Sequence, residues 1–323
     1  MRDASGSVKI SERGICLPSG RWRGNSAGKP LEMAAGMNDV KSGMIERIVR
    51  EALEEDLRTA GDITSTALFS PEDTAAAVII SKSTGVISGM CLVEPLFRGC
   101  DDRLAVDLAL TDGAPLEQGT RIAAVSGPIR GILAGERTVL NFLQHLGGVA
   151  TLASRYAAAI AHTSCRLLDT RKTMPLLRLF EKEAVVHGGG ANHRFGLFDM
   201  LLIKDTHVKR SGGVATALRR AFDYRRNAGA ENIKIEIEVQ SVEEFSTALA
   251  LHPDRIMLDN MTVEAMRTCA ALRKGVSPRV ELEASGNVTL ATIAGIAETG
   301  VDFISVGALT HSAPALDIHL VIQ

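Results

Sequence analysis

Residues 169–208, DTRKTMPLLRLFEKEAVVHGGGANHRFGLFDMLLIKDTHV, decide the fold that this sequence predicts. Apolar residues lead into Asp169 and again into Lys204, and each run stops at that charged residue. Short apolar runs that end in this way are typical of buried parallel strands that carry a charged side chain at the carboxyl end. Between them, His193 and Arg194 follow three glycines, so many cations are gathered in one region. Because clustered cations are costly unless an anion neutralises them, the stretch predicts a pocket for a multiply charged anion.

The pattern of an apolar run with a polar end repeats along the rest of the chain. Further runs end at Glu238, Asp259, Ser285 and Gly307. Helical patterns separate them over residues 214–226, 242–251, 263–273 and 290–298. Repeated β–α units of this length predict a parallel α/β barrel or a doubly wound sheet, with all strand ends on one face. In barrels that face carries the chemistry. The residues expected around this mouth are Asp169, Arg171, Lys172, Lys204, Asp205, Glu238 and Asp259.

The first half of the chain predicts a smaller α/β layer. An amphipathic helix is expected to begin near Lys41, and a later helix to begin at Glu136 and to be interrupted at Gly147 and Gly148. Strands with glycine turns are expected at residues 75–81, 85–88, 104–110, 122–125 and 129–133. The predicted organisation is an N-terminal domain (41–145), a barrel domain (146–310) and a C-terminal segment (311–323) that returns to the N-terminal domain.

Residues 1–40 differ from the rest because they are rich in Gly, Ser and Arg and lack periodicity. We interpret them as a mobile extension, or as the product of a start codon placed too far upstream, with Met37 and Met44 as later candidates. The arginine content also fits a transit peptide, but the acidic residues Asp3, Glu12 and Glu32 weaken that interpretation.

Composition excludes several classes of protein. The 323 residues allow two domains or a barrel with an appendage, and the net charge of −2 argues against a general nucleic-acid or membrane-surface binder. No apolar run is long enough to span a membrane, and no N-terminal apolar segment indicates a signal peptide. The 5 cysteines are scattered without a CxxC pair, which indicates reduced thiols in a cytoplasmic protein. There is no zinc-ligand spacing, P-loop or nucleophile elbow.

The charged residues at the strand ends could also have no role in binding. An isolated Arg171 and Lys172 would be a solvated surface pair, and a lone His193 a structural histidine. The adjoining strand and the glycine triplet favour a site instead. His145, His187 and His207 are interpreted as structural or supporting residues.

Acidic groups and tight turns extend the predicted mouth. Glu236 and Glu238 point to the same side of one strand, and periodicity leaves open which of them faces the mouth. Opposed cationic and acidic groups suit an anionic substrate that also carries a metal ion or sugar hydroxyls. The turns at residues 285–287 and after Gly307 can precede helix N-termini, which bind phosphate.

Together, these motifs and their order resemble the quinolinate phosphoribosyltransferase family, also called nicotinate-nucleotide pyrophosphorylase (carboxylating). The matching blocks are 55–57 with 61–64, 136–141, 169–173 with Pro175, 188–190 with 192–194 and 196–197, 202–205, 258–260 and 283–286. The resemblance covers residues 44–318. It implies an α/β protein with an N-terminal α/β sandwich domain and an incomplete parallel α/β barrel.

The resemblance also implies the activity of a pentosyl-class glycosyltransferase. Family members transfer the phosphoribosyl group of 5-phosphoribosyl 1-diphosphate to quinolinate with decarboxylation, giving nicotinate mononucleotide, diphosphate and CO2 in de novo NAD biosynthesis. Mg²⁺ accompanies the phosphoribosyl diphosphate. The implied partners are these two substrates and a second copy of the chain, in a homodimer or a higher oligomer, without nucleic acid or membrane.

By the same resemblance, each site residue acquires an expected role. The quinolinate carboxylates are expected to contact Arg137 of the neighbouring subunit together with Arg171, His193, Arg194 and Lys204. Thr170 is expected to bind substrate, and Lys172, Glu238 and Asp259 to be catalytic and to face the phosphoribosyl diphosphate. The metal is expected at Glu238 and Asp259, directly or through substrate or water. The 5-phosphate is expected at Ser285, Gly286, Asn287 and Gly307. The family spacing favours Glu238 over Glu236.

Three positions depart from the family pattern. Leu176 and Asn287 stand where glycine is common, and Thr206 stands where asparagine is common. Three other functions compete with the implied one. The first is a phosphoribosyltransferase-like protein associated with molybdenum transport, and the second is a barrel lyase or aldolase with a Schiff base on Lys204. The third is a non-catalytic binding protein on an enzyme scaffold.

Overall fold

A computed structural model describes residues 30–323, with side chains from residue 41 onward. The chain forms two compact units, one ending at Ser42 and the other comprising residues 43–323, which holds all the strands described here. Helix α1 (Pro30–Leu57) crosses that boundary and begins before the predicted start near Lys41. Of residues 1–40, interpreted as a mobile extension, the product of a late start codon or a transit peptide, residues 30–40 belong to this helix and residues 1–29 lie outside the described residues.

The N-terminal layer is a four-stranded antiparallel sheet in the order β12-β1-β5-β3. Its strands are β1 (Thr74–Ser81), β3 (Ala105–Leu108), β5 (Arg121–Pro128) and β12 (Ile318–Ile322). β2 (Gly85–Val86) pairs with β4 (Pro115–Leu116), and the short helices of this layer are α2 (Ile63–Leu68), η1 (Met90–Leu92) and α3 (Val93–Cys100). The strands predicted near 75–81, 85–88, 104–110 and 122–125 are confirmed, whereas β4 was not predicted.

Helix α4 corrects two predictions. It runs unbroken from Ile129 to Ile160, so the predicted strand at 129–133 and the predicted interruption at Gly147 and Gly148 are both wrong. A short apolar run fits either period, so the first error reflects an ambiguity of the pattern itself. The glycines have a packing role, because a Cβ on Gly148 would lie 2.2 Å from the carbonyl oxygen of Pro314. They let the chain leading to β12 cross closely over the helix.

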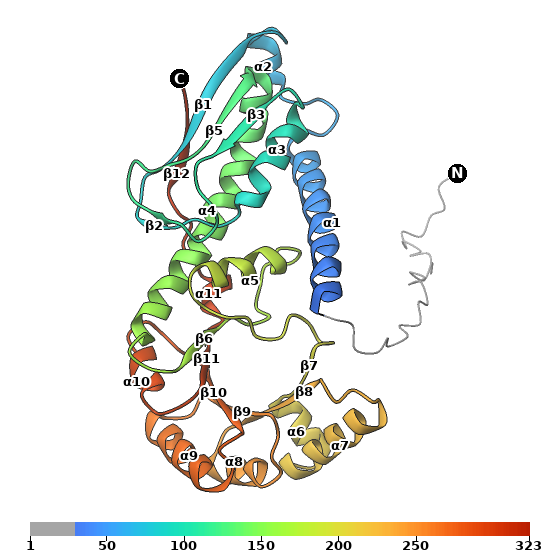
Figure 1. Cartoon of the computed structure of the whole chain (residues 1–323), viewed down its shortest axis with the longest axis vertical. Helices are drawn as coiled ribbons and strands as arrows, with labels where there is room; N and C mark the ends of the chain where they lie inside the picture. The colour runs from blue at the N-terminus through green and yellow to red at the C-terminus, as the bar shows by residue number, and fades with distance from the viewer. Residues whose placement is uncertain (1–29) are drawn as a thin grey trace, which may run out of the picture. The chain divides into compact units, whose positions relative to one another are not determined.

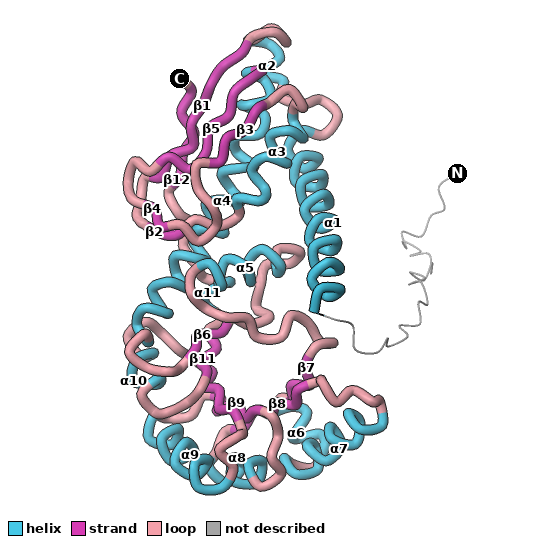
Figure 2. Tube along the Cα trace, in the orientation of Figure 1, coloured by secondary structure: helices cyan, strands magenta, loops and turns pink. Residues whose placement is uncertain are grey.

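The second layer is a row of six parallel strands in the order β6-β11-β10-β9-β8-β7. They are β6 (Arg166–Leu168), β7 (Met200–Ile203), β8 (Lys234–Val239), β9 (Arg255–Asp259), β10 (Glu281–Ser285) and β11 (Phe303–Ser305). The strands curve into an arc whose order begins at β6 and ends at β7 (Figure 2). The predicted incomplete parallel α/β barrel is therefore confirmed.

The helices that follow these strands line the outside of the arc (Figure 1). They are α6 (Asp205–Ser211), α7 (Val214–Asn227), α8 (Val242–Leu249), α9 (Val263–Val276) and α10 (Ile293–Ala297); α5 (Arg178–His187) and α11 (Ala308–His311) are two further helices. The helices predicted over 214–226, 242–251, 263–273 and 290–298 are confirmed with small shifts of their ends, whereas α5, α6 and α11 were not predicted.

Strand alternation divides the barrel core into two sides. Apolar side chains such as Ile237, Leu258 and Leu282 are fully buried. The residues between them include Glu236, Glu238 and Glu283, which alternation places on the opposite, interior side. Barrel interiors are usually filled by branched apolar side chains, so this charged interior marks a functional region.

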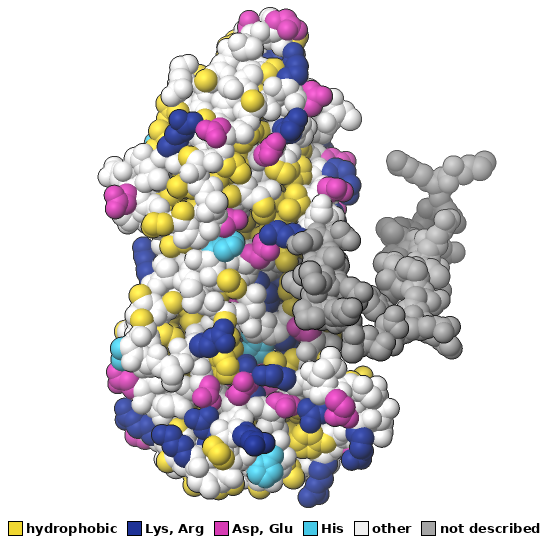
Figure 3. Space-filling view, viewed as in Figure 1, with side chains coloured by type: hydrophobic (Ala, Val, Ile, Leu, Met, Phe, Trp, Pro, Cys, Tyr) yellow, Lys and Arg dark blue, Asp and Glu magenta, His cyan; other side chains and the backbone are white. Residues whose placement is uncertain are grey.

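Three features of the structure bear on the protein classes that composition argued against and on the predicted state of the cysteines. In the part of the chain that the structure describes, no helix is both long and apolar enough to cross a membrane. Basic and acidic side chains intermingle on the face shown in Figure 3, as the small net charge leads one to expect. Cys165 and Cys269 are buried, and burial raises the pKa of Cys165 to about 12, so these thiols pack as apolar groups as predicted. Cys16 lies outside the described residues.

Candidate active site

A cavity of about 300 Å³ lies where the barrel strands end. It is lined by Thr170, Arg171, Lys172, His193, Arg194, Leu202, Lys204, Glu238, Met257 and Ser305. The structure thus brings together most of the predicted substrate-binding cations and one predicted acid. It also answers the question that periodicity left open, because Glu238 lines the cavity and Glu236 is buried away from it.

The cavity carries more positive than negative charge. Its cations are Arg171, Lys172, Arg194 and Lys204, and its one carboxylate is Glu238, with Oε1 2.5 Å from the Lys204 Nζ. Among the described residues, no carboxylate lies within 4.0 Å of the charged nitrogens of Arg171, Lys172 or Arg194. The buried Nε of Arg171 also has no hydrogen-bond acceptor there. The cavity is therefore suited to an anion that supplies the missing acceptors.

Arg194 is held tightly at the edge of β7. Its side chain is largely buried, and Nη1 donates to the carbonyl oxygen of Met200 at 3.1 Å. Burial lowers the pKa of the Arg194 guanidinium, and the nearby positive charge of Arg171 lowers it further. Two guanidinium groups thus share one region despite their repulsion. Asp199 fixes the following loop by accepting hydrogen bonds from the N–H groups of Phe195 and Gly196, at 2.6 and 2.9 Å.

The ring of His193 makes contacts to the protein through both nitrogens. Nδ1 accepts from the backbone N–H of Arg194 at 2.7 Å, and Nε2 lies 3.1 Å from Glu236 and 3.4 Å from Glu283. Burial lowers the pKa of His193, but the two carboxylates outweigh burial and raise it to about 9. The Arg194 N–H opposes a second proton on Nδ1, but one backbone N–H is outweighed by the two carboxylates at Nε2, so the ring is positively charged at neutral pH. In either state Nε2 carries the proton and faces the carboxylates, so His193 offers the cavity a ring edge and, when protonated, a charge.

Glu236 and Glu283 form a buried carboxylate pair beneath His193. Burial, and after it the charge of Glu283, raise the pKa of Glu236 to about 7. Glu283 accepts a hydrogen bond from Nη1 of Arg255 at 2.8 Å, and the Arg255 guanidinium stacks 4.1 Å from the ring centroid of Phe303. The pair therefore holds less negative charge than two free carboxylates would.

The cluster of His193, Glu236 and Glu283 has the spacing of a metal site, since its possible ligand atoms all lie within 4.8 Å of one another. Two features disfavour a cation there. Nε2 of His193 carries a proton in either state of the ring, and Arg255 already neutralises Glu283. We therefore regard the cluster as a buried charge network that supports His193.

The remaining predicted phosphate-binding residues continue the same row of strand ends beyond the cavity. Ser285 lies in register with Asp259 on β9 and with Ser305 on β11. A Cβ on Gly307 would lie 2.8 Å from Cδ of Lys172, so this glycine allows the lysine to pass close to the backbone. Gly307 directly precedes α11, whereas α10 begins only at Ile293, so the turn at 285–287 does not lead straight into a helix.

Asp259 does not line the cavity itself. It ends β9, and one of its oxygens lies 3.3 Å from Nε2 of Gln240. Arg137 is farther removed, on an exposed part of α4, with Nη2 4.0 Å from Glu136. Within this single chain, neither residue is part of the 300 Å³ cavity.

Two residues predicted at the mouth lie elsewhere. Asp169 is fully buried, accepts a hydrogen bond from the N–H of His193 at 2.8 Å and pairs with Lys182. Asp205 pairs with Lys209 at 3.3 Å on α6. The placement of Asp169 and Asp205 around the mouth is therefore wrong. Asp169 instead joins Lys182 and the backbone of His193, and Asp205 forms an ion pair on its own helix.

Three lining residues were missed by the sequence analysis: Leu202, Met257 and Ser305. Each lies two residues before a predicted strand-end residue, namely Lys204, Asp259 and Gly307. The strand period of two was therefore a signal that could have found them. Leu202 and Met257 add apolar surface, which suits a planar ring between the charged groups.

The departures from the family pattern keep the backbone that glycine would adopt. Leu176 has φ 68° and Asn287 has φ 50°, both in the left-handed region. Asparagine tolerates this region, whereas leucine is strained in it. Asn287 also donates to Oδ1 of Asn260 at 3.1 Å. Thr206 is exposed on α6 and is not among the residues that line the cavity.

The histidines interpreted as structural or supporting residues each contact another part of the protein. His145 contacts Glu181 through Nε2 at 2.7 Å, and Nδ1 of His187 lies 2.9 Å from Oγ of Ser88. Nδ1 of His207 accepts from the N–H of Lys204 at 2.9 Å.

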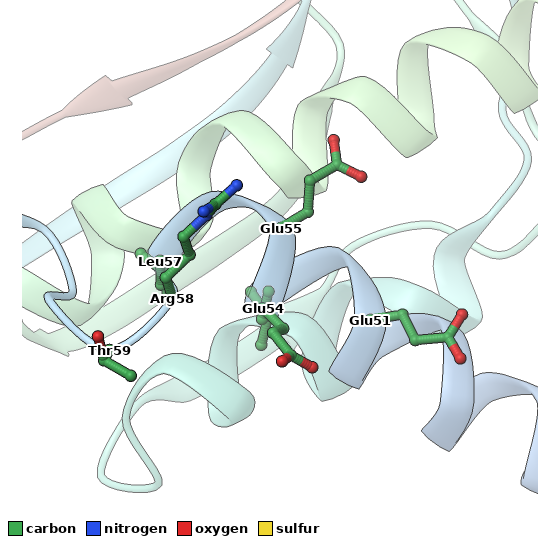
Figure 4. A pocket seen from close by; sticks show the side chains of 7 residues that line it. Glu51, Glu54, Glu55, Leu57, Arg58 and Thr59 are labelled. Carbon is green, nitrogen blue, oxygen red and sulfur yellow. The ribbon is translucent and has the colours of Figure 1, made fainter. Parts of the chain in front are cut away.

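A second hollow lies at the C-terminal end of α1 (Figure 4). The described residues that line it are Glu51, Leu53, Glu54, Glu55, Leu57, Arg58 and Thr59. These side chains come from one helix and the turn after it, and they do not converge on a common point (Figure 4). The barrel cavity, with cations from separate strand ends, is the better candidate for an active site.

The sequence and the fold match one family of proteins over nearly all of this unit. The model described as "Quinolinate phosphoribosyl transferase, N-terminal domain" matches residues 62–147, and its C-terminal counterpart matches residues 149–321. Quinolinate phosphoribosyltransferase (decarboxylating) 1b of Nicotiana tabacum is 40% identical over 290 residues, which cover 86% of this chain and 82% of the relative.

Bacterial proteins of the same family are similar to this chain in sequence and in fold. The probable nicotinate-nucleotide pyrophosphorylase (carboxylating) of Bacillus subtilis is 37% identical over 276 residues, covering 85% of this chain and 92% of the relative. The solved nicotinate-nucleotide pyrophosphorylase of Francisella tularensis superposes with a TM-score of 0.81 at 37% identity, covering 87% of this chain and 96% of that one.

Proposed function

Because the chain belongs to the quinolinate phosphoribosyltransferase family, we propose that it transfers phosphoribosyl from 5-phosphoribosyl 1-diphosphate to quinolinate with loss of CO2. The products are nicotinate mononucleotide, diphosphate and CO2, in NAD biosynthesis. The observation that carries this proposal is the barrel cavity, where Arg171, Arg194 and Lys204 converge with few acids to neutralise them.

Quinolinate is a flat ring with two adjacent carboxylates. The guanidinium groups of Arg171 and Arg194 offer planar donor forks that match carboxylates, and Lys204 adds a mobile charge. Leu202 and Met257 line the same cavity with apolar surface for the ring. We therefore assign the dicarboxylate to this cavity, with Thr170 and the charge of His193 as further support.

The phosphoribosyl diphosphate is assigned to the adjoining strand ends. Lys172 and Gly307 lie next to each other, and Ser285, Gly286 and Asn287 continue the row toward Asp259. Glu238 and Asp259 end neighbouring strands β8 and β9, and their hard oxygen donors fit Mg²⁺. When bound with the diphosphate, Mg²⁺ would neutralise part of its negative charge.

The reaction needs positioning and charge stabilisation more than a strong base. Cleavage of the bond from the ribose C1 to the diphosphate leaves positive charge on the sugar, which Glu238 and Asp259 can stabilise. The pyridine nitrogen of quinolinate then bonds to C1. The resulting pyridinium ring accepts the electron pair left behind by the adjacent carboxylate as CO2 departs, and a proton replaces the carboxylate on the ring.

We also propose that two chains form a homodimer, to which Arg137 of one subunit contributes the remaining carboxylate contact of the other. In support, Arg137 is exposed and lies outside its own chain's cavity. Large apolar side chains are also exposed at Ile63, Leu68 and Phe198. A cytoplasmic location is part of the same proposal, supported by the scattered reduced thiols.

The experiment is to incubate the purified chain with quinolinate, phosphoribosyl diphosphate and Mg²⁺ and to identify the products. We expect nicotinate mononucleotide, with one CO2 and one diphosphate released per turnover. Absence of the nucleotide under these conditions would refute the proposal. Borohydride trapping of a carbonyl substrate on Lys204 would support a lyase, a role that the Lys204–Glu238 ion pair opposes because Glu238 already engages Nζ of Lys204.

A further inference from the structure

One face of helix α5 contacts two loops that carry three of the cavity's four cations, Arg171, Lys172 and Arg194. Arg178, Glu181 and Lys182 are spaced three and four residues apart, so they lie on the same side of the helix. One loop (170–177) carries Arg171 and Lys172, and the other (191–199) carries His193 and Arg194. Neither Arg178 nor its two helix neighbours line the cavity.

Arg178 joins the two loops directly. Its Nε donates to Oγ1 of Thr173 at 3.0 Å, and its Nη2 lies 3.4 Å from the carbonyl oxygen of Arg171, both in the first loop. Its Nη1 donates to the carbonyl oxygen of Phe195 at 3.1 Å, in the second loop. One rigid guanidinium therefore fixes the distance between the backbones next to Arg171 and Arg194.

The other two side chains anchor each loop to the helix. Glu181 is fully buried, and its carboxylate accepts from the N–H of Met174 at 3.0 Å and contacts Nε2 of His145 on α4 at 2.7 Å. Lys182 is almost fully buried and donates to Asp169 and to the carbonyl oxygen of His193 at 3.0 Å. Each loop thus has an anchor of its own, and Arg178 is the member that contacts both.

We propose that Arg178 is a positioning residue for the dicarboxylate: it holds the loops of Arg171 and Arg194 at the spacing of two adjacent carboxylates before substrate binds. The proposal rests on the function proposed above for the identity of that substrate. Its physical reason is the repulsion between the two guanidinium groups, neither of which has a carboxylate within 4.0 Å among the described residues. Without the bridge the loops would separate, and binding would have to restore their geometry.

The test compares Arg178→Met and Arg178→Lys with a matched control, Arg273→Met. Arg273 also bridges chain segments, with bonds to the carbonyl oxygens of Val280 and Gly300 and to Asp302, but it does so next to the starts of β10 and β11. We expect both Arg178 variants to raise the KM for quinolinate at least tenfold, because lysine cannot span three acceptors. Arg273→Met should lower the melting temperature and leave that KM within twofold of wild type.

A second readout does not depend on activity. Amide hydrogen exchange of the peptides covering 170–177 and 192–196 should be at least tenfold faster in Arg178→Met, and unchanged in Arg273→Met. If wild type fails to use quinolinate, the proposed function fails and the exchange data alone decide whether Arg178 holds the loops. An unchanged KM for quinolinate in both Arg178 variants of an active enzyme, or unchanged exchange in both loops, would overturn the positioning role.

Discussion

Nζ of Lys204 lies 2.5 Å from Oε1 of Glu238, so an ion pair joins the cationic side of the cavity to its acidic side. The two residues come from neighbouring strands, Lys204 just after β7 and Glu238 within β8. Lys204 remains about half exposed, at 47%, whereas Glu238 is 9% exposed, so the lysine is free to turn toward a ligand. We expect a bound carboxylate to compete with Glu238 for Lys204, which would release Glu238 to face the sugar.

Replacing Glu238 tests this competition. Glu238→Gln removes the charge that stabilises the developing cation on the sugar, so kcat should fall about 100-fold, a typical loss for one such group. The KM for quinolinate should stay the same or fall, because Lys204 loses its competing partner. Steady-state kinetics with each substrate varied in turn measure both. Glu94→Gln, which alters an exposed pair with Arg98 on α3, is the control. An unchanged kcat in Glu238→Gln would remove this residue from the chemistry.

The carboxylate clamp depends on planar forks and not on charge alone. Arg171→Lys and Arg194→Lys keep the charge but lose bidentate donation. Each should raise the KM for quinolinate at least tenfold, a difference of about 1.4 kcal/mol. Arg220→Lys on α7 is a control at a position that does not line the cavity. Kinetics close to wild type in both clamp variants would contradict the assignment.

Leu176 stores strain in the loop of Arg171. With φ 68° it occupies a conformation that costs a side chain about 1–2 kcal/mol, part of which glycine loses again through its greater freedom in the unfolded chain. Leu176→Gly should therefore raise the free energy of unfolding by about 0.5–1 kcal/mol. Urea denaturation gives the value. The neighbouring Leu177 has φ −92°, so Leu177→Gly should destabilise the fold, and a loss of stability in both variants would argue against strain.

The buried network under His193 predicts how stability depends on pH. The pKa of His193 is raised from 6.5 to about 9 in the fold, because contact with the carboxylates outweighs burial. A raised pKa means that its contribution is fully present below pH 6.5 and is lost as the pH rises through about 9. The loss should be on the order of 1–3 kcal/mol. Denaturant unfolding from pH 6 to pH 9.5 should show this decline in wild type and a smaller decline in His193→Gln. Parallel pH profiles of the two proteins would contradict the prediction.

The strand ends could be predicted from the sequence because the apolar runs and their polar terminators are local features. It could also be predicted that Arg171, Arg194 and Lys204 lie close together. Once the apolar runs are interpreted as parallel strands, their carboxyl ends must lie on one face. How deeply each strand-end side chain is buried could not be predicted. Periodicity places Glu236 and Glu238 on one side of β8, but only the packing of His193 and Arg255 distinguishes a buried charge network from a cavity wall.

Other features depend on contacts between distant segments. The continuity of α4 through Gly147 and Gly148 follows from the crossing of the chain near Pro314, which no local pattern records. The burial of Asp169 depends on Lys182 and on the backbone of His193, both supplied by later parts of the chain. The bridge made by Arg178 likewise needs two loops that meet only in the folded barrel.

We propose that this cavity binds both carboxylates of one planar ring. The decisive measurement compares the initial rates of mononucleotide formation from quinolinate and from nicotinate, at equal phosphoribosyl diphosphate and Mg²⁺. We expect rapid formation with quinolinate and at least a hundredfold lower kcat/KM with nicotinate, which lacks the second carboxylate. A difference of this size corresponds to about 2.7 kcal/mol. Equal rates with the two acids would contradict it.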